Sequence, residues 1–157
     1  MKITNLKEIL LKSKKQCLYL DFRYFGSVNE CLDYLCNKIK DIPSIVILKT
    51  TNISSKIALD LAFKIRQITS LFSSLFLIED RMDILKLTDA DGILITFDSI
   101  DISYAKKIID KEKFFAYFLK SNQNIDVSEF DFLVSSNKEE KNENLICFVL
   151  ENDYDNK

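Results

Sequence analysis

The sequence predicts an α/β fold, in which mostly parallel strands form a sheet and helices pack against it. Short runs rich in Leu, Ile, Val and Phe alternate about six times with longer segments whose apolar residues recur at helical spacing. Several of the short runs are almost uninterrupted, as in strands that are buried on both faces. Residues 75–96 read as strand, turn, helix and strand, which is one βαβ unit of a parallel sheet.

The first elements are an added helix and one βα pair. Residues 5–14 place their apolar side chains on one face and lysines on the other, which predicts an amphipathic helix. The apolar run 17–22 is the first strand, and a turn at Gly26 leads to a helix over about 28–40. Pro43 ends that helix, because the residue before a proline avoids the helical conformation.

The middle of the chain repeats the pattern with little interruption. Residues 44–49 contain a nearly uninterrupted β-branched run, so we expect a strand that is buried on both faces. A helix over 54–70 follows, with alanines that allow close packing against the sheet. Strand 75–78, a short helix over 82–87 and strand 92–96 complete this part.

The regular alternation ends in the last third of the chain. A helix over 103–110 and an aromatic strand over 114–119 still fit the pattern. Only a short helical piece fits before the next apolar run, 130–134, and the segment before the last strand, 145–150, has no apolar stripe. A parallel crossover normally needs about a dozen residues and a packed helix. We therefore expect the last strand to return antiparallel or to pair at an edge.

The length of the chain predicts a single domain over residues 1–157, with an extra N-terminal helix in 1–16 and a polar tail in 151–157. Lys and Arg number 22 against 24 Asp and Glu, a formal charge of −2, so no overall field draws the protein to nucleic acid or to a membrane surface. No apolar run suits a membrane anchor or signal peptide. The four cysteines form no Cys-x-x-Cys pair, which suits reduced thiols and a cytoplasmic protein.

Composition excludes several kinds of chemistry. The chain contains no histidine, so the commonest general base and the Ser-His-Asp and Cys-His arrangements are absent. Its two glycines, Gly26 and Gly92, leave no room for a glycine-rich phosphate loop. Any reaction must therefore use carboxylates, Lys, Tyr, Ser, Thr or a bound cation.

Polar residues gather where the predicted strands end. In an open α/β sheet and in a barrel of parallel strands alike, the functional face lies at the carboxyl ends of the strands. The residues expected there are Asp21, Lys49, Thr50, Glu79, Asp80, Thr96, Asp98, Lys120 and Ser121. A (β/α) barrel usually takes at least about 200 residues, so the pattern alone favours the open α/β sheet.

The middle of the chain also carries a family motif. Residues 77–83 read Leu-Ile-Glu-Asp-Arg-Met-Asp and residues 90–93 read Ala-Asp-Gly-Ile. Together they resemble the Ile-Asn-Asp-Arg-x-Asp and Gly-Ala-Asp-Gly-Val signature of the thiamine-phosphate synthase and thiazole tautomerase family. Cys-Leu-Tyr-Leu at 17–20 and Val-Ile-Leu-Lys at 46–49 stand where that family has Leu-Tyr-Leu-Ile and Val-Gln-Leu-Arg. The resemblance covers roughly residues 17–135.

The resemblance implies a fold and a reaction. The family forms (β/α)8 barrels, so we expect a truncated TIM-barrel-like domain with six to seven mostly parallel strands. Thiamine-phosphate synthases join an aminopyrimidine diphosphate to a thiazole phosphate and release diphosphate with the help of Mg²⁺. Their last two βα units grip the thiazole phosphate through glycine-rich backbone, whereas this chain has no glycine after Gly92.

The resemblance also assigns site residues. Asp80 matches the metal-binding aspartate of the family, and Asp98 or Asp101 serves as a second metal ligand only if the loop shifts. Lys49 replaces an arginine and keeps a positive charge near the diphosphate, without the bidentate fork. Thr50 and Glu79 complete the substrate-binding positions, and Glu79 adds negative charge where the family has asparagine.

Each of these residues has a simpler structural interpretation. Asp80 either binds the metal or caps the short helix that follows it. Arg81 and Asp83 are expected to pair and hold the loop, and Lys49 is either a diphosphate contact or a solvated strand end. Glu79 and Asp80 are also adjacent at a strand end, where paired carboxylates are expected to raise one another's pKa.

Two functions remain open at this stage. One is a thiamine-biosynthesis transferase that acts on the two phosphorylated substrates with Mg²⁺. The other is a non-catalytic member of the family that binds a small phosphorylated ligand or a protein partner. An incomplete barrel exposes strand edges, so we also expect a homo-oligomer in which such edges pair.

Overall fold

The computed structural model describes residues 16–96, 101–119, 126–135 and 147–151. The predicted helix over 5–14, the tail over 152–157 and the candidate metal ligand Asp98 lie outside the described residues.

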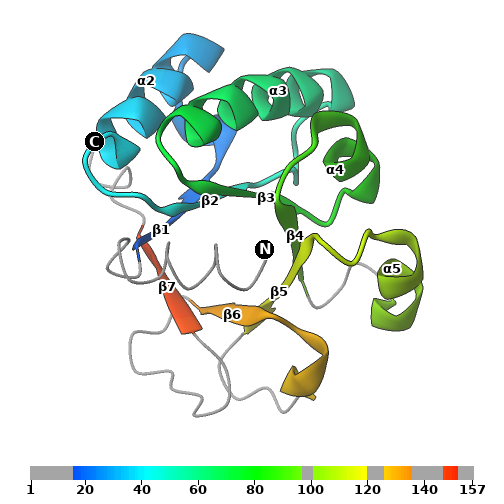
Figure 1. The fold of residues 1–157 in the computed structure, drawn as a ribbon. Helices are drawn as coiled ribbons and strands as arrows, with labels where there is room; N and C mark the ends of the chain where they lie inside the picture. Colours follow the sequence, from blue (N-terminus) through cyan, green and yellow to red (C-terminus); the bar gives the residue numbers. More distant parts are fainter. Residues whose placement is uncertain (1–15, 97–100, 120–125, 136–146, 152–157) are drawn as a thin grey trace.

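Within these described ranges, seven parallel strands form the centre of the molecule and follow one another around a closed barrel in chain order (Figure 1). Their bounds are β1 Gln16–Leu20, β2 Ile45–Leu48, β3 Leu75–Glu79, β4 Gly92–Ile95, β5 Phe114–Leu119, β6 Phe132–Ser135 and β7 Cys147–Glu151. The barrel closes because β7 pairs in parallel with β6 on one side and with β1 on the other. The α/β class, the TIM-barrel-like arrangement and the strand number expected from the sequence are confirmed.

Two expectations about the sheet are wrong. The sheet is not open, and its last strand runs parallel to both neighbours rather than antiparallel or at an edge. The prediction for β7 relied on the lack of an apolar stripe in the segment before it. The direction of β7 is instead determined by its pairing with β1 and β6. Closure also removes the strand edges on which the expectation of edge-paired homo-oligomers depended.

Helices cover the outside of the barrel. The described helical segments are η1 Phe22–Tyr24, α2 Val28–Ile39, α3 Ser55–Leu71, α4 Met82–Thr88, α5 Ile102–Ile108 and η2 Val127–Glu129. Figure 1 shows α2 and α3 lying side by side over β1 to β3, with α4 and α5 following around the barrel. None of the described helices is long and apolar enough to cross a membrane.

Side-chain caps explain where three of the helices begin. Ser27, Ser54 and Asp101 each stand before a helix in extended conformation. Each side chain accepts a hydrogen bond from a backbone N–H in the first helical turn. These bonds satisfy donors that have no partner within the helix.

The core has two layers that follow the alternation of side chains along the strands. One layer contains strand residues only and fills the barrel interior; its buried members are Cys17, Ile45, Ile47, Leu75, Leu77, Leu94, Phe114, Ala116, Phe132 and Val134. The other layer lies between the barrel and its helices, where Val46 and Leu48 meet Leu35, Leu61 and Ile65. Because of this alternation, the residue two places after the last inner position of a strand is directed to the barrel mouth, as Lys49 is after Ile47 and Glu79 after Leu77.

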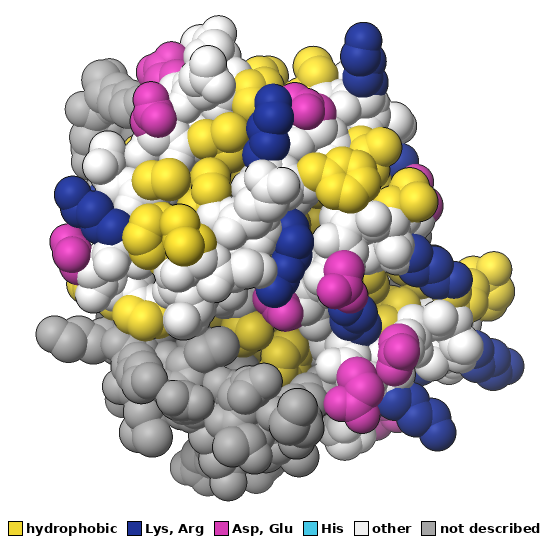
Figure 2. All heavy atoms as spheres, turned by 45° about the horizontal axis from the view of Figure 1, so that its top comes forward, with side chains coloured by type: hydrophobic (Ala, Val, Ile, Leu, Met, Phe, Trp, Pro, Cys, Tyr) yellow, Lys and Arg dark blue, Asp and Glu magenta, His cyan; other side chains and the backbone are white. Residues whose placement is uncertain are grey.

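One face of the molecule carries charged side chains of both signs. On the face in Figure 2, Lys and Arg side chains are interspersed with Asp and Glu and with separate apolar patches. No single-sign field covers this face, which agrees with the balanced charge of the sequence.

Candidate functional site

Polar side chains converge at the carboxyl ends of the first four strands, which form one end of the barrel and are called the mouth below. Asp21 follows β1, Lys49 follows β2, Glu79 ends β3 and Asp80 follows it, and Thr96 follows β4. Because all four strands are parallel, their ends lie together. The structure therefore assembles most of the group that the sequence predicts.

Lys49 lies in the mouth between a carboxylate and an aromatic ring. Its Nζ is 3.6 Å from Oδ2 of Asp21, and its side chain is 24% exposed. The same Nζ lies 5.7 Å from the ring centroid of Tyr19, within the range of a cation–π contact. Lys49 is therefore a positioned cation rather than a solvated strand end.

Asp21 is the buried anion at this position. Its carboxylate accepts hydrogen bonds from the backbone N–H of Arg23 and from the Nε and Nη2 atoms of the Arg23 side chain. Burial opposes ionisation, but the bonds from Arg23 and the charge of Lys49 outweigh it and hold the pKa of Asp21 below its usual range. Asp21 thus stays ionised and caps η1, which ends the first strand two residues earlier than predicted.

Glu79 is almost completely buried at the end of β3, with 2% of its surface exposed. Its Oε1 accepts a 2.6 Å hydrogen bond from the hydroxyl of Thr51. Burial, and secondly the charge of Asp80, raise the pKa of Glu79 from 4.5 to about 7. The carboxyl group of Glu79 is therefore partly protonated near neutral pH, so Glu79 adds less negative charge to the mouth than its sequence suggests.

Thr50 supports the backbone beside Glu79. Its hydroxyl donates a 2.8 Å hydrogen bond to the carbonyl oxygen of Glu79, and the residue is buried. The structure thus links the ends of β2 and β3 through this side chain. A direct contact of Thr50 with substrate stays a prediction.

Asp80 joins the ends of β3 and β4. Its Oδ1 accepts a 2.9 Å bond from the backbone N–H of Thr96, and its Oδ2 accepts a 2.6 Å bond from the hydroxyl of Thr96. Its own N–H donates to the carbonyl of Leu94, and its backbone is left-handed with φ 56°. The expectation that Asp80 caps the following helix is wrong, because α4 begins after Arg81 and has no side-chain cap.

Arg81 and Asp83 form the structural pair that the sequence suggested. The guanidinium donates to both carboxylate oxygens of Asp83, at 2.9 and 2.7 Å, and it also reaches the hydroxyl of Ser55 at the start of α3. The pair therefore ties the beginning of α4 to the beginning of α3.

The mouth offers few protein ligands for a metal ion. Within the described ranges, no three His, Cys, Asp or Glu side chains lie together in a geometry that could hold one. Glu79 and Asp80 are adjacent carboxylates at the mouth, whereas Asp98 falls outside those ranges. This donor set suits a cation that takes its remaining ligands from a substrate or water, as Mg²⁺ commonly does.

Two features of the mouth escaped the sequence analysis. Arg23 places a second cation beside Asp21. The spacing of two residues between them does not by itself predict an ion pair. Tyr19 and Phe118, both partly exposed, stack across the barrel with ring centroids 6.3 Å apart. Both follow buried inner-layer residues by two positions, so strand alternation is the signal that points them to the same end.

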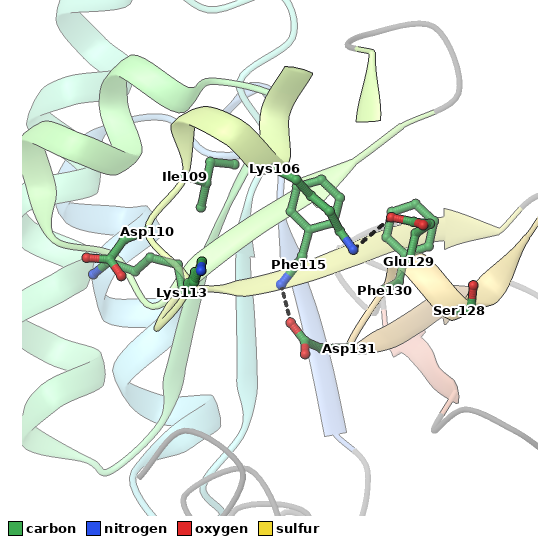
Figure 3. A pocket seen from close by; sticks show the side chains of 10 residues that line it. Lys106, Ile109, Asp110, Lys113, Phe115, Ser128, Glu129, Phe130 and Asp131 are labelled. Carbon is green, nitrogen blue, oxygen red and sulfur yellow. Dashed lines mark hydrogen bonds and ion pairs between the residues drawn. The ribbon is translucent and has the colours of Figure 1, made fainter. Parts of the chain in front are cut away.

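A separate cavity of about 400 Å³ lies at the opposite end of the strands, between α5, the start of β5 and η2 (Figure 3). Its polar groups are largely paired with one another. Lys106 contacts Glu129 at 2.8 Å, and a carboxylate oxygen of Asp131 accepts a bond from the backbone N–H of Phe115. Lys113 is paired with Asp89 at 2.6 Å. These contacts hold α5 and η2 against the barrel.

Comparison with known proteins agrees with this geometry. The sequence profile of the family described as thiamine monophosphate synthase matches residues 26–129. The match covers α2 to η2 and includes the ends of β2, β3 and β4 that build most of the mouth.

Individual relatives show the same similarity over part of their length. Thiamine-phosphate synthase of Fusobacterium nucleatum is 32% identical over 114 residues, which cover 73% of this chain and 50% of the relative. Thiamine-phosphate synthase of Campylobacter jejuni is 29% identical over 110 residues, which cover 69% of this chain and 52% of the relative. The chain thus spans about half the length of these curated relatives.

A solved structure shows the same fold. Thiamine phosphate pyrophosphorylase from Pyrococcus furiosus superposes with a TM-score of 0.64 at 20% identity, over 80% of this chain and 61% of that chain. At this identity the likeness concerns the fold alone. The profile match over residues 26–129 shows that the chain belongs to the thiamine monophosphate synthase family.

Proposed function

We propose that the protein acts as a thiamine-phosphate-synthase-like transferase whose site is the barrel mouth. In this proposal the mouth binds an aminopyrimidine diphosphate with Mg²⁺, and the pyrimidine is transferred to a thiazole phosphate with release of diphosphate. The family match supports the reaction class. The location rests on the general position of active sites at the carboxyl ends of barrel strands.

One observation carries the proposal: a cation and two carboxylates stand at the ends of two adjacent strands. Lys49 follows β2, while Glu79 and Asp80 stand at the end of β3, and β2 and β3 are paired along four residues. Transfer from a diphosphate needs positive charge for the leaving group and carboxylates for its metal ion. The mouth holds both kinds of group within one pair of strands.

Asp80 is the residue that would hold Mg²⁺. Its two carboxylate oxygens accept hydrogen bonds from the backbone N–H and from the hydroxyl of Thr96. Those bonds fix the orientation of the carboxylate, as outer partners of metal ligands usually do. Bound Mg²⁺ supplies neutralisation of the charge that develops on the departing diphosphate.

A second function, ligand binding without turnover, is favoured by the pairing of Lys49. The charge of Lys49 is partly balanced by Asp21 at 3.6 Å. An ammonium in this position attracts a diphosphate, but it stabilises a leaving group less than the bidentate fork of an arginine would. Binding that exceeds catalysis is the expected behaviour of such a site.

Turnover separates the two functions. Purified protein is incubated with Mg²⁺, the aminopyrimidine diphosphate and the thiazole phosphate, and formation of thiamine phosphate is followed. Product formation supports the transferase. A raised melting temperature with the pyrimidine diphosphate, but no product, supports binding alone. Neither product nor stabilisation contradicts both functions.

Replacement of Lys49 tests the location. Lys49→Gln is expected to raise the KM or Kd for the pyrimidine diphosphate by about tenfold or more, because a charge-assisted contact contributes about 1.5–3 kcal/mol. Lys64→Gln is the matched control, because Lys64 is an exposed residue of α3 paired with Asp60 away from the mouth. Equal behaviour of the two variants places the site elsewhere.

A further inference from the structure

Two cations at the mouth converge on the same oxygen atom. Nη2 of Arg23 lies 2.6 Å from Oδ2 of Asp21, and Nζ of Lys49 lies 3.6 Å from that oxygen. Two nitrogens that contact one oxygen at these distances are at most about 6 Å apart. Arg23 comes from η1 and Lys49 from the end of β2, so the pair exists only in the folded barrel.

The two cationic side chains of this cluster are more exposed than the carboxylate between them. The side chain of Arg23 is 48% exposed and that of Lys49 is 24% exposed, whereas that of Asp21 is 6% exposed. One buried carboxylate therefore underlies two accessible cations. The cluster carries a formal net charge of +1, because it contains two basic side chains and one carboxylate whose pKa lies below its usual range.

We infer that Arg23 and Lys49 form a two-cation seat for the diphosphate group of the ligand, with Asp21 as its resident counter-anion. The inference rests on the proposed function, because it assumes that the mouth takes a diphosphate. It goes further by adding Arg23 to the site and by giving Asp21 a defined role. The binding group is identified by its chemistry: two linked phosphates that offer oxygens to both cations.

Arg23 supplies what Lys49 lacks. A guanidinium offers a planar fork that binds two phosphate oxygens at once, whereas an ammonium acts as a point charge. In the structure the fork of Arg23 already makes such a contact with the carboxylate of Asp21. A diphosphate that enters the mouth shares or takes over this fork, while Lys49 neutralises the second phosphate.

Asp21 has two opposing effects on ligand binding. It orients both cations before the ligand arrives, because its hydrogen bonds hold the Arg23 side chain in place. It also competes with the ligand, because a carboxylate and a phosphate seek the same donors. Removing the charge of Asp21 while keeping its shape is therefore expected to strengthen diphosphate binding.

The first test measures binding of inorganic pyrophosphate, with and without Mg²⁺, by isothermal titration calorimetry. Arg23→Gln is expected to weaken binding about tenfold, and Arg23→Lys to restore part of the loss because it returns the charge without the fork. Lys64→Gln removes one charge outside the mouth and is expected to bind like the unchanged protein. Melting temperatures without ligand establish that the variants are folded.

The second test measures a gain of pyrophosphate affinity rather than a loss. Asp21→Asn is expected to bind pyrophosphate several-fold more tightly while it lowers the melting temperature of the ligand-free protein. A variant that merely misfolds does not gain affinity, so this result distinguishes a competing anion from a structural residue.

Three results would overturn the two-cation seat. They are equal pyrophosphate affinity of Arg23→Gln and Lys64→Gln, weaker binding by Asp21→Asn, and no binding of pyrophosphate by the unchanged protein. The first two leave the proposed transferase intact if thiamine phosphate still forms and Lys49→Gln still impairs its formation. Failure of the transferase is read separately, from the absence of product with both organic substrates.

Discussion

Asp80 is an aspartate at a strand end, a position where this residue type can make several different contacts. Its sequence position suits a helix cap, a metal ligand or a loop brace. The structure uses both carboxylate oxygens to join β3 to β4 through Thr96. The left-handed backbone at φ 56° makes this contact achievable, and Asp is among the residues that tolerate such a conformation. No local pattern reveals which of the three contacts is formed.

The Thr96 hydroxyl is the simplest place to test this brace. Thr96→Val removes the 2.6 Å bond to Asp80 but keeps the backbone bond. The free energy of unfolding, measured with urea, is expected to fall by about 1–3 kcal/mol because a charged acceptor loses a donor. Thr96→Ser retains the hydroxyl and is expected to lose less than half of that amount. Equal losses in the two variants would assign the effect to packing.

Glu79 makes stability depend on pH in a defined direction. Burial, and then the charge of Asp80, raise its pKa from 4.5 to about 7 in the folded protein. Between these values the folded state binds more protons than the unfolded state, so the free energy of unfolding falls as pH rises from about 5 to 8. The expected loss is about 2 kcal/mol, since one pKa unit corresponds to about 1.4 kcal/mol.

Glu79→Gln isolates this contribution. Urea unfolding in EDTA at pH 5 and pH 8 is expected to show a smaller pH effect in the variant than in the unchanged protein. The carboxylates with lowered pKa values, such as Asp21 and Asp83, change protonation mainly below about pH 4 and lie outside this interval. An identical pH effect in both proteins would contradict the account of Glu79.

Contacts at the start of β4 explain why the Ala-Asp-Gly segment has an aspartate and a glycine at these positions. A side chain at Gly92 would place its Cβ 2.4 Å from the backbone oxygen of Phe114, where β4 and β5 pair. Asp91 accepts bonds from Arg66 and from the backbone N–H of Phe76, which anchors the turn before the strand. The motif is therefore explained by close strand pairing as well as by family membership.

Gly92→Ala tests the close approach. The free energy of unfolding is expected to fall by about 1–3 kcal/mol or more, because the neighbouring backbone must shift. Gly26→Ala is the matched control: its Cβ would meet only the end of the flexible Glu30 side chain, at 2.8 Å. We expect a loss below about 1 kcal/mol there. Similar losses at both glycines would contradict this explanation.

Most elements follow from local sequence, and their bounds differ from the predicted ones by only a few residues. Periodicity identifies α2 and α3 because each presents a clear apolar stripe, and β2 and β3 because they are continuous apolar runs. The direction of β7 does not follow, because it depends on pairing with β1 and β6 rather than on the residues of β7 themselves.

At the scale of the whole molecule, the sequence does not determine whether the sheet closes into a barrel. An open sheet and a barrel share the same strand–helix alternation, and they differ only in whether the first and last strands meet. Here β1 and β7 pair along three residues. Size favoured the open sheet because complete eight-stranded barrels are larger, but seven strands close in this structure.

The mouth is partly predictable for a geometric reason. Residues that follow parallel strands must gather at one end, so Lys49, Glu79 and Asp80 were found without a structure. Arg23 was not found, because its contact with Asp21 depends on the conformation of the short η1 turn. Its partnership with Lys49 depends further on the pairing of β1 with β2.

Chemical-shift mapping tests most directly whether the mouth is the functional site. Amide signals of ¹⁵N-labelled protein are followed as the aminopyrimidine diphosphate and Mg²⁺ are added. We expect saturable shifts at the strand ends, at Arg23, Lys49, Thr51, Glu79 and Thr96. Shifts confined to the opposite cavity, or no shifts at saturating ligand, would contradict a ligand site at the mouth.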